Sequence, residues 1–286
     1  MDHPEYTTRE AFEAVRGERG LAWEGAGLWR EGLLEGLGRP TVAIVGTRAA
    51  TPYGRRLARS IAAELGTAGC CIVSGLALGI DAAAHEGALD AAAPTVGVLG
   101  SGHGQFFPAR NLQLAERMIA AGGAVLSPFP PRECAQPWHF LARNAIVAAL
   151  ADAVLVIEAP ARSGALNTAG WAAPRIPVLA VPGDVDRAHV AGCHALIRDG
   201  AILACNAADV LEVLHLHSSA PVRERPHRDG PPGALLDALS RGECNLDDLI
   251  DATGLAPAQA LAELAVLELE GVVERRGATR FACSSG

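Results

Sequence analysis

The stretch TVAIVGTRAATPYG, residues 41–54, combines a short apolar run, a turn with one early glycine, and the beginning of a helical pattern. The start of a helix presents unpaired backbone N–H groups and the positive end of the helix dipole, and both attract phosphate. Gly46 opens the turn, and Arg48 follows two residues later. The stretch therefore predicts a phosphate-binding loop between a buried strand and a helix.

The same alternation of short apolar runs and alanine-rich helical stretches continues to about residue 214. The runs are continuous in apolar character, which is typical of strands buried on both faces of a parallel sheet. Residues 40–214 are therefore predicted to form a Rossmann-like, doubly wound, mostly parallel α/β sheet. Its helices are expected at residues 53–65, 81–89, 111–121, 143–150, 166–173, 193–198 and 207–214.

The flanking segments have different patterns. Residues 1–39 are partly helical in pattern and are assigned to no domain, whereas residues 215–232 carry four prolines among charged residues and predict a linker. Residues 233–286 contain three helical patterns, followed by a hairpin expected to turn at Arg276–Gly277. Three helices with a two-stranded wing predict a winged-helix domain. The helices are expected to start at Gly233, Asn245 and Ala256.

The charge pattern restricts where a polyanion can bind. The chain has 24 basic residues, all of them arginine, against 32 acidic residues, for a net charge of −8. This balance argues against a generally basic nucleic-acid coat. Residues 230–286 hold 4 arginines against 9 acidic residues, so a polyanion site is expected in the nearly neutral middle segment. Any basic contact to phosphate must come from arginine.

Membrane, metal and secretory functions find no support in the sequence. No apolar stretch approaches the length of a membrane span, and the polar N-terminus lacks the apolar segment of a signal peptide, so a cytoplasmic protein without a membrane partner is expected. The seven cysteines have no C-x-x-C or cysteine–histidine spacing typical of zinc. No metal site is predicted.

Cofactor and hydrolase motifs are also incomplete, and no cofactor is predicted. The first loop lacks G-x-G-x-x-G, and the second strand ends in Ser74–Gly75 without the carboxylate that a dinucleotide ribose requires. A Walker A lysine and a Gly-x-Ser-x-Gly motif are both absent. Asp81 and His85 lie one helical turn apart, and we interpret them as a helix N-cap and a surface or packing histidine.

The loops expected at the carboxyl ends of the strands are rich in glycine, serine and arginine. Ligands of doubly wound sheets bind at this edge, and small residues let a ligand backbone approach closely. Hydroxyls and N–H groups in such loops can surround an anion. The loops are residues 46–54, 74–81, 100–111, 158–170 and 182–186.

Six motifs occur in order across residues 42–203: VAIVGTR…YG, IVSGLALGIDAAAHEGAL, VGVLGSG…FPARN, FLARNAIVAAL, LVIEAPARSGALNTA and VPGDVDRAHVAGCHALIRDGAIL. In order and density over about 160 residues they resemble the DNA-processing protein A family, DprA, also called Smf. The tail is similar to the winged-helix extension of many members. The resemblance implies a core that binds and protects single-stranded DNA, forms a homodimer and loads the RecA recombinase during natural transformation, without catalysis.

The resemblance also implies a nucleic-acid-binding set. The arginine of the family's VG[ST]R motif contacts single-stranded DNA and corresponds to Arg48. The basic residue before Ser-Gly is usually lysine in the family and is Arg162 here. The other matches line the same pocket. The full set is Gly46, Arg48, Ser74, Gly75, Phe140, Arg143, Asn144, Arg162, Ser163 and Gly164.

Three motifs depart from the family pattern. Leu78 and Ala145 stand where arginine is usual, and Gly192–Cys193–His194 stands for G-T-N. Two basic positions are thus lost. The helix expected at residues 53–65 carries Arg55, Arg56 and Arg59, which either compensate or form a solvated face. Both interpretations stay open.

Other functions were weighed against DNA binding. An enzyme of the related LOG group would cleave nucleotides with a glutamate in P-G-G-x-G-T-x-x-E, but the matching loop, SGALNTAGWA, holds no acid. Glu158 precedes that loop, and we expect it to orient loop N–H groups or an arginine. The third tail helix carries Glu263, Glu268 and Glu270 and no arginine, which argues against major-groove recognition. Four aromatic residues in the loops either pack or stack on bases: Phe106, Phe107, Trp138 and Phe140.

Overall fold

The computed structural model describes residues 4–19, 23, 25–216, 230–239, 244–269, 272–275 and 279–283. The chain forms two compact units, Met1–Ala220 and Pro221–Gly286. Across the described ranges, none of the helices combines the length and the apolar character that crossing a membrane requires.

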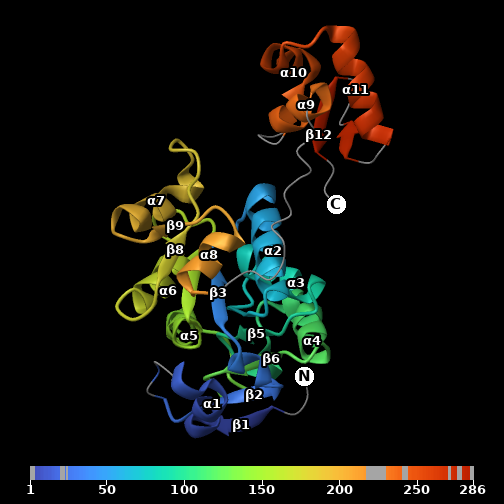
Figure 1. Cartoon of the computed structure of the whole chain (residues 1–286). Coiled ribbons are helices and arrows are strands. Elements are labelled where there is room, and N and C mark those ends of the chain that lie inside the picture. The colour runs from blue at the N-terminus through green and yellow to red at the C-terminus, as the bar shows by residue number, and fades with distance from the viewer. Residues whose placement is uncertain are drawn as a thin grey trace. The chain divides into compact units, whose positions relative to one another are not determined.

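A nine-stranded sheet forms the centre of the first unit, in the order β1-β2-β6-β5-β4-β3-β7-β8-β9 (Figure 1). The strands from β3 to β9 run parallel, and β1 and β2 are antiparallel to their neighbours. This arrangement confirms the predicted doubly wound, mostly parallel sheet. The strands are β1 (Glu5–Thr8), β2 (Gly27–Gly32), β3 (Thr41–Val45), β4 (Cys71–Ser74), β5 (Thr95–Val98), β6 (Ala124–Ser127), β7 (Ala153–Val156), β8 (Val178–Ala180) and β9 (Ile202–Leu203).

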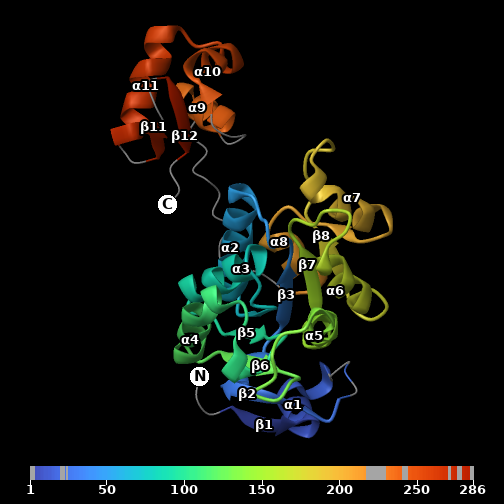
Figure 2. The same cartoon turned by 180° about the vertical axis from the view of Figure 1, so that it is seen from behind.

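Helices cover both faces of the sheet, as the two opposite views show (Figures 1 and 2). Alternate residues of β3 divide between two hydrophobic clusters, because successive side chains of a strand point to opposite faces. Ala43 and Val45 pack with the α1, α5, α6 and α7 side, whereas Val42 and Ile44 pack with α2, α3 and α8. The helices are α1 (Arg9–Arg16), α2 (Pro52–Thr67), α3 (Ile80–Asp90), α4 (Leu112–Ala120), α5 (Pro137–Ala149), α6 (Gly164–Ala172), α7 (Ala191–Arg198) and α8 (Ala207–Val213).

Helix α5 starts earlier than the predicted start at residue 143. The helix begins at Pro137, because proline fits the first helical position and Gln136 caps the helix together with His139. The Gln136 N–H donates to His139 Nδ1 at 3.2 Å. The extra turn at the N-terminus carries Phe140 to the carboxyl edge of the sheet.

The order of the strands creates a switch point between β3 and β7. From β3 the chain builds the sheet outward through β4, β5 and β6, and then returns to the other side of β3 to place β7. The connections after β3 and β7 therefore leave in opposite directions, which opens a crevice at the carboxyl ends of the strands.

The described residues of the N-terminal segment, 1–39, extend this same sheet. The strand β1 pairs with β2, and β2 pairs with β6 through Trp29 and Ser127. Buried Arg16 on α1 donates to the Leu150 carbonyl at 2.5 Å and to Asp152 at 2.8 Å, so it anchors the segment beside β7. The amino-acid sequence of the segment gives no local indication of these distant partners.

The second unit confirms the winged-helix fold. Three helices pack on a three-stranded antiparallel sheet of order β10-β12-β11, so one short strand adds to the predicted wing. Asn245 caps the second helix by accepting from the Asp248 N–H at 2.8 Å. The expected turn at Arg276–Gly277 and linker residues 217–229 lie outside the described residues. The elements are α9 (Pro231–Leu239), β10 (Cys244–Asn245), α10 (Leu246–Thr253), α11 (Pro257–Leu269), β11 (Val273–Arg275) and β12 (Arg280–Cys283).

Candidate nucleic-acid interface

A pocket of ≈ 310 Å³ opens at the switch point, outside the carboxyl ends of β3 and β7. Its walls come from the loops after β3, β4 and β7 and from the N-terminal half of α5. The structure brings almost the whole predicted set together here: Gly46, Arg48, Gly75, Phe140, Arg143, Asn144, Arg162, Ser163 and Gly164 all line the pocket. The exception is Ser74, which is buried and donates to the Ile44 carbonyl at 2.6 Å.

Arg48 and Arg162 bring uncompensated charge to this pocket. Both side chains are exposed, and among the described residues neither makes a hydrogen bond or an ion pair. The Arg48 guanidinium carbon lies 4.9 Å from the centre of the Phe140 ring. This cation–π contact orients Arg48 without neutralising it. Glu158, expected to orient loop N–H groups or an arginine, accepts from Thr51 and pairs with neither of these arginines.

Arg143 lines the same pocket but is held by the protein. Its guanidinium donates to the carbonyls of Gly75 and Val98, the latter at 2.9 Å, and Nε donates to Asn144 Oδ1 at 3.1 Å. Burial lowers the pKa of Arg143, and the charge of Asp81 opposes this shift. The Gly75 N–H donates to Asp81 at 3.1 Å. A Cβ on Gly75 would overlap both charged side chains, so only glycine fits between them.

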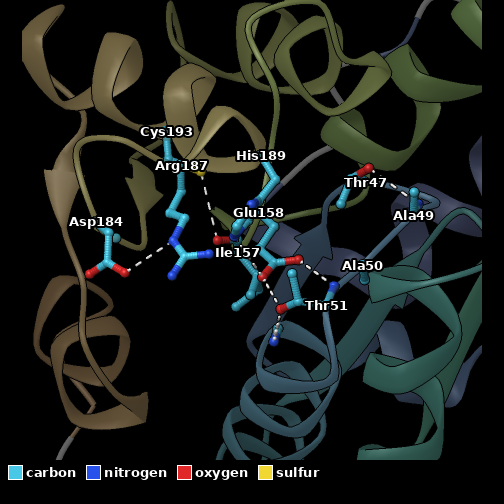
Figure 3. Close-up of polar contacts among 12 residues, drawn as sticks. Thr47, Ala49, Ala50, Thr51, Ile157, Glu158, Asp184, Arg187, His189 and Cys193 are labelled. Atoms are coloured by element: carbon cyan, nitrogen blue, oxygen red, sulfur yellow. Dashed lines mark hydrogen bonds and ion pairs between the residues drawn. The ribbon is translucent and has the colours of Figure 1, made fainter. Parts of the chain in front are cut away.

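Buried Glu158 fixes the other side of the pocket by holding the start of α2 (Figure 3). Its carboxylate accepts from the Thr51 N–H at 2.9 Å and from the Thr51 hydroxyl at 2.5 Å. The hydroxyl oxygen in turn accepts from the Gly54 N–H at 2.9 Å, which caps the helix. A side chain at Gly54 would overlap the Glu158 carboxylate. The prediction that Glu158 orients loop N–H groups is confirmed.

The Asp81 and His85 interpretations have different outcomes. The N-cap of α3 is Gly79, so the assignment of Asp81 as the cap is wrong; its buried carboxylate instead accepts from loop N–H groups in the preceding turn. Desolvation raises the pKa of Asp81, and the charge of Arg143 opposes this shift. His85 is a packing histidine, fully buried with Nδ1 2.7 Å from the Thr95 hydroxyl.

Several of the residues discussed with the departures from the family pattern make contacts within the protein. Cys193 donates weakly from Sγ to the Ile157 carbonyl at 3.7 Å (Figure 3), and His194 Nε2 lies 3.0 Å from the Gly183 carbonyl, so this segment ties α7 to β7 and to the loop after β8. On α2, Arg59 is paired with Asp90 and Glu86. Arg55 donates to the Ala50 carbonyl at 2.6 Å.

The wing of the second unit presents partly neutralised charge. Arg275 on β11 lies 3.5 Å from Glu268 of α11 and 5.0 Å from the centre of the Phe281 ring.

No group of three histidine, cysteine or acidic residues suited to a metal occurs within the part of the chain that the structure describes.

Glu158 is foreseen from the sequence, whereas Thr51 and Asn111, which also support the site, are not. Thr51 directly before Pro52 is a signal of a helix N-terminus, and an acid directly after an apolar strand, as in LVIE, is a signal of a buried anchor. Asn111, which donates to the carbonyls of Leu76 and Ala77 at 2.8 and 3.0 Å, fixes the loop after β4 and has no such signal.

Fold and site together define a doubly wound α/β protein with an arginine-lined pocket at its switch point, joined to a winged-helix unit. The chain belongs to the DNA recombination-mediator protein A family, whose model matches residues 21–215. A second model, the DprA winged helix domain, matches residues 219–278.

Individual relatives agree with this assignment. The chain is 43% identical over 248 residues to the putative DNA processing protein DprA of Mycobacterium tuberculosis, covering 82% of this chain and 62% of that protein. It is 40% identical over 188 residues to Protein Smf of Escherichia coli, covering 65% of this chain and 50% of that protein. The chain thus spans less than two thirds of the length of these relatives.

Two solved structures are similar to this chain. DNA processing protein A of Streptococcus pneumoniae matches with a TM-score of 0.61 and 39% identity, covering 65% of this chain and 66% of that one. DNA processing protein A of Helicobacter pylori, whose structure is described as showing a unique single-stranded DNA binding mode, matches with a TM-score of 0.64 and 29% identity. That match covers 75% of this chain and 97% of the Helicobacter chain.

Proposed function

We propose that this chain binds single-stranded DNA, and that the pocket at the switch point holds the DNA backbone. The observation that carries the proposal is the position of Arg48 and Arg162, which enter one pocket from the two sides of the switch point and have no ion-pair partner in the described part of the chain. Charge-assisted hydrogen bonds from a basic side chain to phosphate are strong. Membership of the family and the described DNA binding of the Helicobacter relative support the same function.

The pocket favours a flexible strand over a rigid duplex. The phosphate-binding groups lie in a concave site at a sheet edge and belong to loops and a helix start, not to a broad basic surface. The net charge of −8 provides no general attraction for duplex DNA. A single strand can fold its backbone into the pocket.

The biological role that we propose follows the family. The chain shields incoming single-stranded DNA and loads the RecA recombinase onto it during natural transformation, acting as a homodimer through the α/β core in the cytoplasm. The family assignment and the DNA-processing names of the relatives support this role. Co-sedimentation of RecA with the DNA-bound protein, and filament formation on DNA coated with a single-strand-binding protein, test it.

We propose no catalytic step. Asp81 is the acid among the described residues that line the pocket, and it is buried against Arg143 and the N–H of Gly75. Glu158 is engaged with Thr51 and does not line the pocket. The rival function, LOG-like cleavage of nucleoside monophosphates, therefore finds no free general acid or base among the described residues that line the pocket. Release of free base from these nucleotides would support that rival.

A gel-shift comparison tests the DNA-binding proposal. The full chain is titrated against a single-stranded oligonucleotide and the matching duplex at two salt concentrations. We expect preference for the single strand and a log–log salt slope of about −0.7 per phosphate engaged. Equal affinity for the two DNA forms, or affinity independent of salt, would contradict the phosphate pocket.

A further inference from the structure

A second pocket adjoins the first through one shared residue. It has a volume of ≈ 630 Å³ and is lined by residues 104–107, residues 134–137 and Phe140. Phe140 also lines the arginine pocket, where its ring makes the cation–π contact with Arg48. A ligand that lies against Phe140 can therefore occupy both pockets.

The two pockets differ in chemistry. Three arginines line the first pocket, whereas the described residues that line the second carry no ionisable acid or base apart from the Cys134 thiol. The second pocket presents aromatic surface: the Phe107 side chain is 47% exposed, and its ring centre lies 5.9 Å from that of Phe140. The second pocket therefore suits an uncharged, flat group, whereas the first pocket suits an anion.

The second pocket is built before any ligand arrives. Backbone hydrogen bonds join the two loops that contain the lining segments: the Gly102 N–H donates to the Glu133 carbonyl and the Gly104 N–H to the Pro131 carbonyl, both at 2.8 Å. Gln136 is committed to capping α5. A rigid pocket loses little conformational entropy on binding, which favours retention of a weakly interacting base.

Two cations flank the lining segments. Arg110 follows residues 104–107 by three positions, and Arg132 precedes residues 134–137 by two. Both are exposed, and within the described part of the chain neither has a hydrogen bond or an ion pair. Further positive charge therefore lies close in sequence to both lining segments.

We propose that the second pocket receives a DNA base, stacked on Phe107, next to the phosphate that Arg48 contacts. This inference rests on the proposed DNA binding. Aromatic platforms accept every base because each base has a π face, so the pocket adds affinity with little sequence preference. It separates two contributions to binding: phosphate contact at the arginines and base stacking at Phe107.

The test compares two probes of equal length: an oligo-dT, and an abasic oligomer that has the same sugar–phosphate backbone but no bases. The full chain, Phe107→Ala, Phe107→Trp and Arg48→Ala are titrated with both. Trp171→Ala serves as the matched control, because Trp171 is also 47% exposed but lies near the C-terminal end of α6 and lines neither pocket. Quenching of 2-aminopurine placed in the oligo-dT reports stacking on the unmodified protein.

We expect Phe107→Ala to weaken oligo-dT binding by roughly five-fold or more, to leave abasic binding unchanged, and to abolish most of the 2-aminopurine quenching. Phe107→Trp should restore oligo-dT binding, and Trp171→Ala should change neither probe. Arg48→Ala should weaken both probes by a similar factor.

Other outcomes overturn the inference in distinguishable ways. If the unmodified chain binds both probes equally and 2-aminopurine is not quenched, no base enters a stacked site, and phosphate binding still stands. If Phe107→Ala weakens both probes alike, Phe107 only supports the loop. If the unmodified chain binds neither probe, the proposed DNA binding itself fails.

Discussion

No acidic side chain among the described residues neutralises the charge of Arg48 or Arg162. We expect Arg48→Ala and Arg162→Ala each to reduce single-strand affinity roughly ten-fold, because each removes a charge-assisted contact of about 1.5–3 kcal/mol. The double variant should nearly abolish binding and reduce the salt slope. Arg162→Lys should retain most of the affinity, because a point charge suffices for phosphate. Fluorescence anisotropy at two salt concentrations measures all four variants.

The control for these variants is Arg59→Ala on α2. Arg59 is already paired with Asp90 and Glu86, so its loss should leave DNA affinity unchanged. A lower melting temperature for the Arg48 and Arg162 variants, with unaltered affinity per folded molecule, would show that they serve only loop structure.

His85 links the stability of the first unit to pH. Burial, followed by the charge of Arg143, lowers the pKa of His85 from 6.5 to about 3. Below pH 6.5 the unfolded chain therefore binds a proton at His85, whereas His85 in the folded chain stays neutral until the pH approaches 3. Stability contributed by the neutral ring is complete above pH 6.5 and falls as the pH drops towards 3. Between pH 6.5 and 5 we expect a loss of about 2 kcal/mol. Urea unfolding of His85→Gln should show a shallower decline over this range; parallel curves would contradict the assignment.

At the scale of elements, the start of α2 depends on Thr51. The residue caps the helix and supplies both donors that the buried Glu158 carboxylate accepts. Thr51→Ala removes the cap and the hydroxyl donor, and we expect it to destabilise the protein by about 2–4 kcal/mol. Thr67→Ala, at the exposed end of the same helix, should change stability by no more than about 0.5 kcal/mol. Equal losses in chemical denaturation would show that the Glu158 contact contributes nothing.

The sequence predicts elements well where the signal is local. The central strands and most helices follow from continuous apolar runs and alanine-rich stretches, and the pocket follows from glycine-rich loops at strand ends. The pairing of β2 with β6 escapes such analysis, because it joins residues distant in sequence. The burial of Arg143 escapes it for the same reason, since its acceptors belong to the ends of β4 and β5.

At the scale of the whole molecule, the two units have separate cores. The cluster around Leu235, Leu264 and Phe281 contains residues of the second unit alone. We expect deletion of residues 233–286 to leave single-strand affinity within a few-fold, because the pocket lies in the first unit and this segment carries excess acid. Anisotropy titration of the truncated chain measures this. A loss of a hundred-fold would place the main DNA contact on the winged-helix unit.

The position of the pocket at the junction of β3 and β7 has a mechanical consequence. DNA bound by Arg48 and Arg162, as proposed above, would be attached just beyond the ends of two adjacent central β-strands, which are paired from Val42 with Ala153 to Val45 with Val156. Tension along the bound DNA would load this pair in the middle of the sheet, where neighbours on both sides share the strain. An attachment at an edge strand would instead peel hydrogen bonds one after another. The proposed site is thus attached to the centre of the sheet and not to its edge.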